Sequence, residues 1–144
     1  MINLFRDRYA FLSNFFPCRV VIDGIFYPSA EHAYQSQKTL DRSKRFSIAA
    51  LRTAAEAKKV GRLLVDIRED WNLVKLNEME RIIIFKFKAP CVRKMLLSTD
   101  DEDLIEGNYW GDKFWGICLK TNEGENHLGK ILMKVREFYR EVDK

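Results

Sequence analysis

The segment that most constrains the fold is residues 18–27, in which two largely apolar runs flank the pair Asp23-Gly24. A tight type I′ turn requires two residues with positive φ, and this pair supplies them, so the segment predicts an antiparallel β-hairpin. Pro28 and Ser29 follow directly. Because proline lacks an amide hydrogen and serine can accept one at a helix start, we expect a helix to begin at Ser29.

Helical periodicity dominates the middle of the chain. We expect one amphipathic helix around residues 46–51 and a second over 54–64. A long helix is expected from about residue 73 to 88, with Met79, Ile82, Ile83 and Phe87 at helix spacing. Pro90 ends that segment, and a short helix that contains Val92, Met95 and Leu96 is expected after it.

The last third of the chain combines strands with a terminal helix. Residues 103–108 predict a strand, with 115–119 as its partner. Asn126 is expected to cap the last helix, whose predicted buried face consists of Leu128, Ile131, Leu132, Val135 and Phe138. The predicted class is α+β, a helix-rich domain with a small antiparallel sheet.

Composition narrows the cellular context. The 144 residues fit one domain, residues 1–144, and the net charge of +4 is spread along the chain. Three cysteines without a CxxC pair argue against a disulfide framework and favour a reducing, cytoplasmic setting. The first residues lack the pattern of a signal peptide, and the longest apolar run, residues 82–85, is too short to span a bilayer. We therefore expect no membrane association.

The first candidate site lies on the helix that starts at Ser29. Residues seven apart lie within about 20° of each other round a helix and about 10.5 Å apart along it. Glu31 and Lys38 would then share one face, with Gln35 between them. A solvated helix surface would also contain such residues, so both interpretations stay open. In the functional interpretation, the helix dipole favours an ionised Glu31. Desolvation would make Lys38 a nucleophile that can form a Schiff base with a sugar aldehyde.

The second candidate site is the tryptophan-rich segment 106–116. An indole such as Trp115 offers a flat face to a base or sugar, and Asp112 can bind ribose hydroxyls or transfer a proton. Trp110 and Trp115 are equally compatible with a place in the core. Asp112 is expected to be a solvated loop carboxylate whose removal leaves stability nearly unchanged.

Two further segments carry polar groups with open roles. Residues 124–129 begin the last helix, whose N–H groups could bind phosphate, or Asn126 could simply cap it. Asn14 lies in an otherwise apolar run, so it is either a ligand of the substrate or a structural bracket. Two histidines and three scattered cysteines lack metal-ligand spacing, so we expect no zinc site.

These segments together resemble the YbiA-like, or NADAR, family of N-glycosidases. The resemblance runs through the whole chain in order, over residues 11–17, 31–38, 57–62, 70–75, 86–87, 96–99, 106–116, 124–129 and 132–136. Two departures are Phe16, where tyrosine is usual, and the acidic link 100–103. The acidic link could alter what approaches the pocket.

The resemblance implies an N-glycosyl hydrolase that cleaves the bond between a base and C1 of a phosphorylated ribose or ADP-ribose. Family substrates divide between early riboflavin-pathway intermediates and ADP-ribosylated guanine, and no metal or other cofactor is implied. The partner would be a small phosphoribosyl or ADP-ribosyl compound, with ADP-ribosylated nucleic acid as a further substrate. The implied catalytic residues are Glu31, Lys38 and Asp112. The implied substrate-binding residues are Asn14, Tyr34, Arg62, Trp115 and Asn126.

Two other classes remain as alternatives. A non-catalytic module that binds ADP-ribose or a related nucleotide would need the same phosphate contacts, but it would not need two carboxylates and an amine. A nucleic-acid-binding protein is suggested by the pI of about 9.0. The chain lacks the concentrated basic stripe typical of that class.

Overall fold

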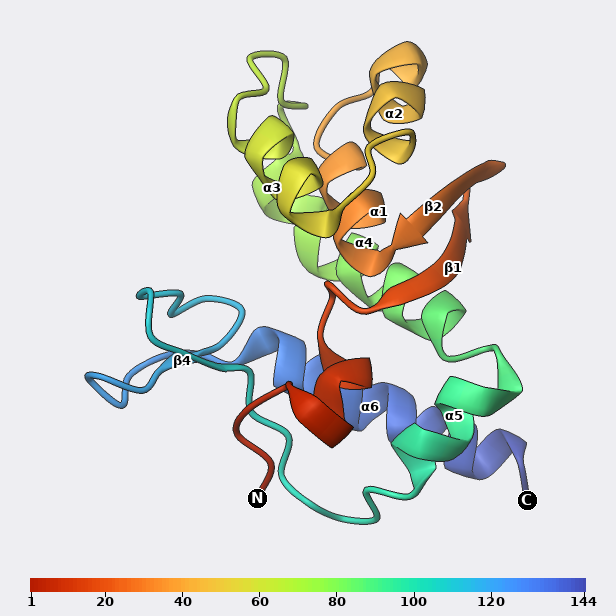
Figure 1. The fold of residues 1–144 in the computed structure, drawn as a ribbon, viewed down its shortest axis with the longest axis vertical. Helices are drawn as coiled ribbons and strands as arrows, with labels where there is room; N and C mark the ends of the chain where they lie inside the picture. Colours follow the sequence, from red (N-terminus) through yellow and green to blue (C-terminus); the bar gives the residue numbers. More distant parts are fainter. The chain divides into compact units, whose positions relative to one another are not determined.

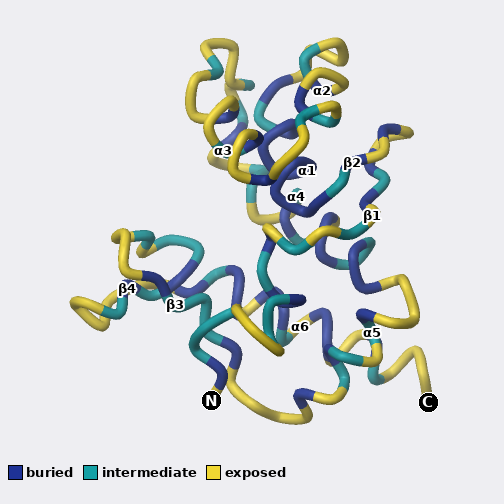
Figure 2. The backbone as a smooth tube through the Cα atoms, viewed as in Figure 1, coloured by how far each residue is buried: buried dark blue, intermediate teal, exposed yellow.

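The computed structural model describes all 144 residues, which form two compact units (Figure 1). The first unit consists of Met1–Ser13 with Phe87–Lys144, and the second of Asn14–Lys86. Each unit has its own buried residues (Figure 2). No helix combines the length and the hydropathy that a membrane span requires. The prediction of a single domain over 1–144 stays a prediction.

The 14–86 unit begins with the expected hairpin. Strands β1 (Pro17–Ile22) and β2 (Ile25–Ser29) pair antiparallel, with Ile22 opposite Ile25. Asp23 and Gly24 have φ angles of 52° and 79°, as a type I′ turn requires. The hairpin prediction is therefore confirmed, and the pair forms the small antiparallel sheet of the predicted α+β class.

Helix α1 (Ala30–Ser36) follows the hairpin directly and is buried along its whole length. The Ser29 hydroxyl accepts a hydrogen bond from the backbone N–H of His32, so the predicted cap is confirmed. Burial excludes the solvated-surface interpretation of this helix. The predicted length was wrong, because α1 ends at Ser36 and Lys38 lies in the turn that follows.

Three further helices contact α1 and enclose it: α2 (Arg42–Ala49), α3 (Ala54–Arg62) and α4 (Trp71–Lys86). Asp41 and Thr53 cap α2 and α3 by accepting hydrogen bonds from backbone N–H groups of the first turn. In α4 the buried side chains include Met79, Ile82 and Ile83, as the periodicity predicted. The helix expected around residues 46–51 begins earlier, at Arg42, and its buried apolar residue is Ile48, whereas Phe46 is half exposed.

The other unit contains a 3₁₀ helix, η1 (Asp7–Leu12), and the helices α5 (Pro90–Leu97) and α6 (His127–Val142). Pro90 begins α5, as expected for a residue without an amide hydrogen. In α6 four of the five predicted apolar positions are buried, but Phe138 is 46% exposed and Tyr139 takes its place. Positions 128, 131, 132, 135 and 139 follow the helical period, so Phe138 lies off that face.

The predicted strand pair in this unit is much shorter than expected. Strands β3 (Gly107–Asn108) and β4 (Ile117–Cys118) have two residues each and are parallel. Leu104 makes only an isolated bridge to Ile2. Most of residues 103–119 is therefore loop, and that loop carries the second candidate site. All three cysteines are free thiols.

Candidate functional site

Glu31 is the central residue of the site in the 14–86 unit. It lies in the first turn of α1, only 7% exposed, and its backbone N–H donates to the Asn14 carbonyl oxygen at 2.9 Å. The Gln35 side chain, one turn further along α1, donates from Nε2 to Glu31 Oε2 at 2.6 Å. A buried carboxylate bonded by an N–H donor and placed at a helix N-terminus is stabilised as the anion.

Lys38 supplies an amine beside this carboxylate. Its backbone carbonyl accepts a hydrogen bond from the Arg68 N–H at 2.7 Å, which fixes the turn after α1. Its Nζ lies 5.5 Å from the centroid of the Tyr34 ring, and Tyr34 packs against Trp71 with ring centroids 5.4 Å apart. The Lys38 amine thus lies over an aromatic ring, near enough to the Glu31 carboxylate to feel its charge.

Burial lowers the pKa of Lys38 below its usual value, and the Glu31 carboxylate opposes that effect. The cations Arg62, Lys75 and Lys58 lower the pKa of Lys38 further. A lowered pKa increases the fraction of neutral amine, which is the nucleophilic form. The same cations make this part of the unit attractive to an anion such as phosphate.

The two remaining predicted residues of this unit differ in accessibility. Arg62, the last residue of α3, is exposed, so its guanidinium is available to bind phosphate with two parallel hydrogen bonds. Asn14 is buried, and its Nδ2 lies 3.5 Å from the Met79 sulfur while its Oδ1 has no hydrogen-bond partner. Buried amide oxygens normally have partners, so Asn14 Oδ1 is a candidate acceptor for a substrate hydroxyl.

In the other unit, Asp112 organises the loop between β3 and β4. Its Oδ1 accepts hydrogen bonds from the backbone N–H groups of Phe114 and Trp115 at 3.1 and 2.9 Å. The buried Asn108 side chain closes the loop, because its Oδ1 accepts from the Asp112 N–H and its Nδ2 donates to the Asp112 carbonyl. Asp112 is half-buried and has a structural task that the sequence did not indicate.

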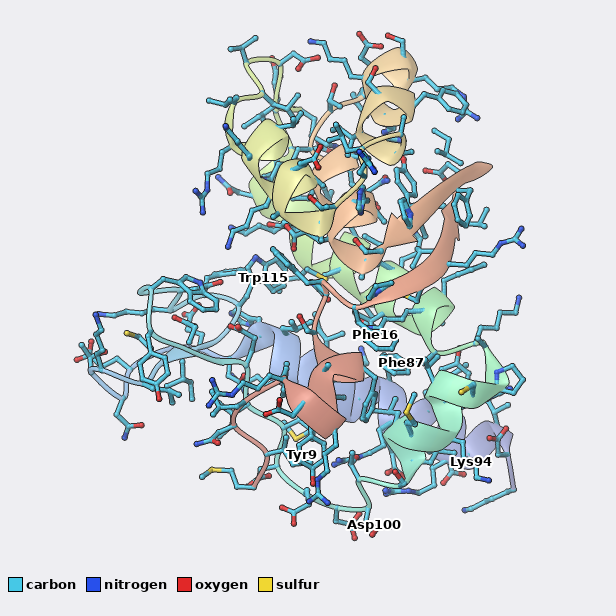
Figure 3. All side chains as sticks on the ribbon, viewed as in Figure 1. Tyr9, Phe16, Phe87, Lys94, Asp100 and Trp115 are labelled. Atoms are coloured by element: carbon cyan, nitrogen blue, oxygen red, sulfur yellow. The ribbon has the colours of Figure 1, made fainter.

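Trp115 and Trp110 are placed differently in this loop. Trp115, labelled in Figure 3, is half-buried. Its ring packs edge-on against that of Phe114, with ring centroids 4.8 Å apart. Trp110 is 67% exposed, so neither indole is a fully buried core residue.

Asn126 occupies the N-cap position of α6, but the prediction that its side chain caps the helix was wrong. With φ at 53°, its amide turns away from the helix start. Its Oδ1 accepts from the Glu106 N–H at 2.9 Å and its Nδ2 donates to the Leu104 carbonyl at 3.0 Å. A Cβ at residue 129 would lie 2.4 Å from this amide, so Gly129 gives it room. A role of Asn126 in substrate binding stays a prediction.

The start of α6 offers fewer free donors than expected. The backbone N–H groups of His127 and Leu128 donate to the carbonyl oxygens of Phe114 and Trp115 at 3.1 and 2.9 Å. These two groups are therefore not available to a phosphate, which leaves the exposed Arg62 as the better candidate among the predicted residues.

The predicted residues therefore divide between the two units. Asn14, Glu31, Tyr34, Lys38 and Arg62 lie in the 14–86 unit, and Asp112, Trp115 and Asn126 lie in the other. No group of three or more histidine, cysteine, aspartate or glutamate side chains is arranged to hold a metal ion. Gln35 was placed between Glu31 and Lys38 by the sequence but was not predicted to be a site residue, and Trp71 was missed. Gln35 could have been found from its four-residue spacing to Glu31, which places both on one helix face.

Comparison with known proteins identifies the protein family to which the chain belongs. The model of the NADAR domain matches residues 4–140, so the chain belongs to the NADAR domain family. Among its relatives is the N-glycosidase Npun_R5314 of Nostoc punctiforme, 39% identical over 93% of this chain and 88% of that protein. The riboflavin biosynthesis protein VVA0006 of Vibrio vulnificus is 36% identical over 91% of this chain, but the match covers only 36% of that protein.

A solved structure supports the same assignment. The N-glycosidase YbiA of Escherichia coli is 34% identical in sequence over 95% of this chain and 87% of its own length. Its NMR structure matches with a TM-score of 0.86 at 30% identity, covering 99% of this chain and 87% of that one. The family resemblance and the α+β fold class predicted from the sequence are thereby confirmed.

Proposed function

We propose that this protein is an N-glycosidase that hydrolyses the bond between a base and C1 of a phosphorylated ribose or ADP-ribose. The family and the names of its relatives support the N-glycosidase activity. The substrate is either an early riboflavin-biosynthesis intermediate, which the name of the Vibrio vulnificus relative favours, or ADP-ribosylated guanine. We also propose that residues 1–144 act as one cytoplasmic domain.

The observation that carries the proposal is the buried Glu31–Gln35 pair together with the half-buried Lys38, whose pKa responds to the Glu31 charge. A module that only binds a nucleotide has no need to bury a carboxylate beside an amine of lowered pKa, because the carboxylate repels an anionic ligand. An enzyme that acts on C1 of ribose can use both: the carboxylate moves a proton, and the neutral amine attacks carbon.

In the proposed reaction the Lys38 nitrogen attacks C1, and the bond from C1 to the base breaks. The leaving nitrogen of the base takes up a proton, and the carboxylic acid form of Asp112 is the proposed donor. The ribose ring opens to a protonated imine on Lys38 when a proton passes from the attached nitrogen to O4′. Water then adds to C1, Glu31 accepts a proton from that water, and cleavage of the carbon–nitrogen bond releases the sugar and restores the amine. Glu31 then gives its proton to solvent and Asp112 takes one up, so both groups return to their starting forms. The net reaction consumes one water and no cofactor.

We infer the substrate contacts from the family resemblance. Arg62 binds the phosphate, Asn14 and Asn126 bind hydroxyls, and Tyr34 and Trp115 provide aromatic faces to the sugar or base. The cations around Lys38 would draw the phosphorylated substrate toward the carboxylate and amine.

The experiment that tests the function is a substrate panel. The protein is incubated with phosphorylated ribosylaminopyrimidines, with ADP-ribosylated guanosine and with an ADP-ribosylated oligonucleotide, and released base is measured by mass spectrometry. Release from one class identifies the substrate. Tight binding of ADP-ribose without release of base from any member would instead favour the non-catalytic module.

A further inference from the structure

Helix α1 contains a further residue, Gln35, whose side chain contacts Glu31. We propose that Gln35, seated over Gly61 of α3, is a positioning residue that holds the Glu31 carboxylate in one orientation and in its ionised form. The inference rests on the proposed function, because it assumes that Glu31 serves the reaction.

The bond between the two side chains is short and buried. Gln35 is 4% exposed, and its Nε2 donates to Glu31 Oε2 at 2.6 Å. A hydrogen bond to an ionised acceptor is shorter and stronger than one between neutral groups, and it favours the ionised form. The four-residue spacing also limits the orientations in which Glu31 can reach the Gln35 donor.

Gly61 provides the space in which the Gln35 amide lies. A Cβ at residue 61 would lie 1.9 Å from Gln35 Oε1, 2.5 Å from its Cδ and 2.9 Å from its Cβ. No real side chain tolerates such contacts, so any residue larger than glycine displaces Gln35. Glycine within a helix is less favourable than alanine. At position 61 that penalty is offset by the room glycine leaves for the Gln35 amide.

The oxygen of the Gln35 amide argues against a role in packing alone. Its Oε1 is buried and has no hydrogen-bond partner. An unsatisfied buried acceptor is unfavourable, and an apolar side chain of similar size would avoid that penalty. Reversing the amide would bring Oε1 against the Glu31 carboxylate, acceptor against acceptor. The contact with Glu31 therefore determines both the presence of the amide and its orientation.

Other charged groups around Glu31 must be held constant in any test. Lys38 is coupled to Glu31, and Lys58 and Arg62 of α3 and Lys75 of α4 act on Lys38. Asp23 of the hairpin turn is paired with Arg45 of α2 and Arg81 of α4, which both donate hydrogen bonds to it. All of these groups remain in the variants below, so a change in the titration of Glu31 reports the lost donor.

The decisive variant is Gln35→Met, which keeps the size of the side chain and removes the donor. We expect the pKa of the Glu31 carboxyl, followed by side-chain ¹³C NMR, to rise, because hydrogen bonds to the charged form lower a carboxyl pKa. The acid limb of the kcat/KM profile should move up equally. We expect kcat to fall roughly tenfold or more while KM changes less, as for a group bonded to a charged partner.

Gly61→Ala is the second variant, and Ala57→Gly is the matched control. Gly61→Ala should shift the titration of Glu31 in the same direction and lower kcat. Ala57→Gly removes a buried methyl group from the same helix and should leave both unchanged. In a Gln35→Ala background, Gly61→Ala should have no further effect on kcat, because its action passes through the amide.

An unchanged Glu31 titration in folded Gln35→Met would overturn the inference. If that variant does not fold, the titration of Gly61→Ala decides in the same way. Equal losses of kcat from Gly61→Ala in the wild-type and Gln35→Ala backgrounds would also contradict it. The NMR titration requires no turnover, so failure of the positioning role is distinguishable from failure of the proposed activity.

Discussion

The two carboxylates of the proposed site are held in contrasting ways. Glu31 lies on a buried helix and accepts a hydrogen bond from the Gln35 side-chain amide one turn away. Asp112 lies in a loop and accepts hydrogen bonds from two backbone N–H groups, so it shapes the loop that carries Trp115. Because Asp112 is bonded to the backbone of its own loop, we expect its substitution to disturb the backbone more than substitution of Glu31.

This contrast corrects one expectation from the sequence. A solvated loop carboxylate would be removable at almost no cost in stability, but Asp112 is a structural acceptor as well as a candidate catalytic group. A loss of activity in an Asp112 variant must therefore be compared with its loss of stability. For Glu31 variants we expect a loss of activity without a comparable loss of stability.

The largest expected effect is at Lys38. Lys38→Arg keeps the positive charge but cannot form an imine, so we expect it to lose turnover. Borohydride added during turnover should fix a sugar adduct on the wild-type protein, and peptide mass mapping should place that adduct at Lys38. Full turnover by Lys38→Arg would exclude the covalent route and leave direct attack by water.

The pH dependence sharpens the same prediction. Burial lowers the pKa of Lys38, so the neutral amine accumulates as pH rises through that lowered value. The yield of trapped adduct should rise with pH over that range, provided that a pH-independent concentration of borohydride is maintained. A yield that falls with rising pH would contradict attack by the neutral amine.

A second lysine, Lys86, tests whether burial lowers lysine pKa values in this protein. Lys86 is fully buried, and burial lowers its pKa to about 8. Between about pH 8 and 10.5 the unfolded chain binds one more proton than the folded protein, so Lys86 makes the unfolding free energy rise by about 3 kcal/mol across that range. Denaturant titrations of wild type and Lys86→Met should show this rise only in the wild type. Parallel curves would mean that Lys86 does not titrate as its burial predicts.

The smaller effect on stability is expected at Asp112. Asp112→Ala should lower the unfolding free energy by about 1–2 kcal/mol, because two backbone N–H groups lose their acceptor. Asp112→Asn retains an acceptor oxygen and should keep most of the stability while it loses turnover. Chemical denaturation and base release, measured on both variants, separate the two tasks. Equal stability of Asp112→Ala and wild type would show that the loop does not depend on these bonds.

Local features were predictable from the sequence. The Asp23-Gly24 turn and the Ser29 cap depend on neighbouring residues, so both were recovered. The end of α1 before Lys38 depends on tertiary contacts such as the Arg68 N–H on the Lys38 carbonyl. Periodicity cannot report such contacts.

The loop of the second candidate site was less predictable for a similar reason. Its shape depends on side-chain bonds from Asn108 and Asp112 to the backbone, which formed in place of the longer strands that were expected. The orientation of the Asn126 amide depends on its positive φ, which sequence spacing does not reveal. Residue types identified both candidate segments, but only the structure shows which of their polar groups are already bonded.

The most direct test of the account is the turnover of Glu31→Gln on whichever substrate the panel identifies. The substitution preserves the size of the side chain and removes its charge, so the melting temperature should stay close to that of the wild type. Base release should fall by at least roughly 10²-fold, the lower end of what a positioned acid–base group contributes. A folded Glu31→Gln protein that releases base at the wild-type rate would contradict the catalytic role of the buried carboxylate.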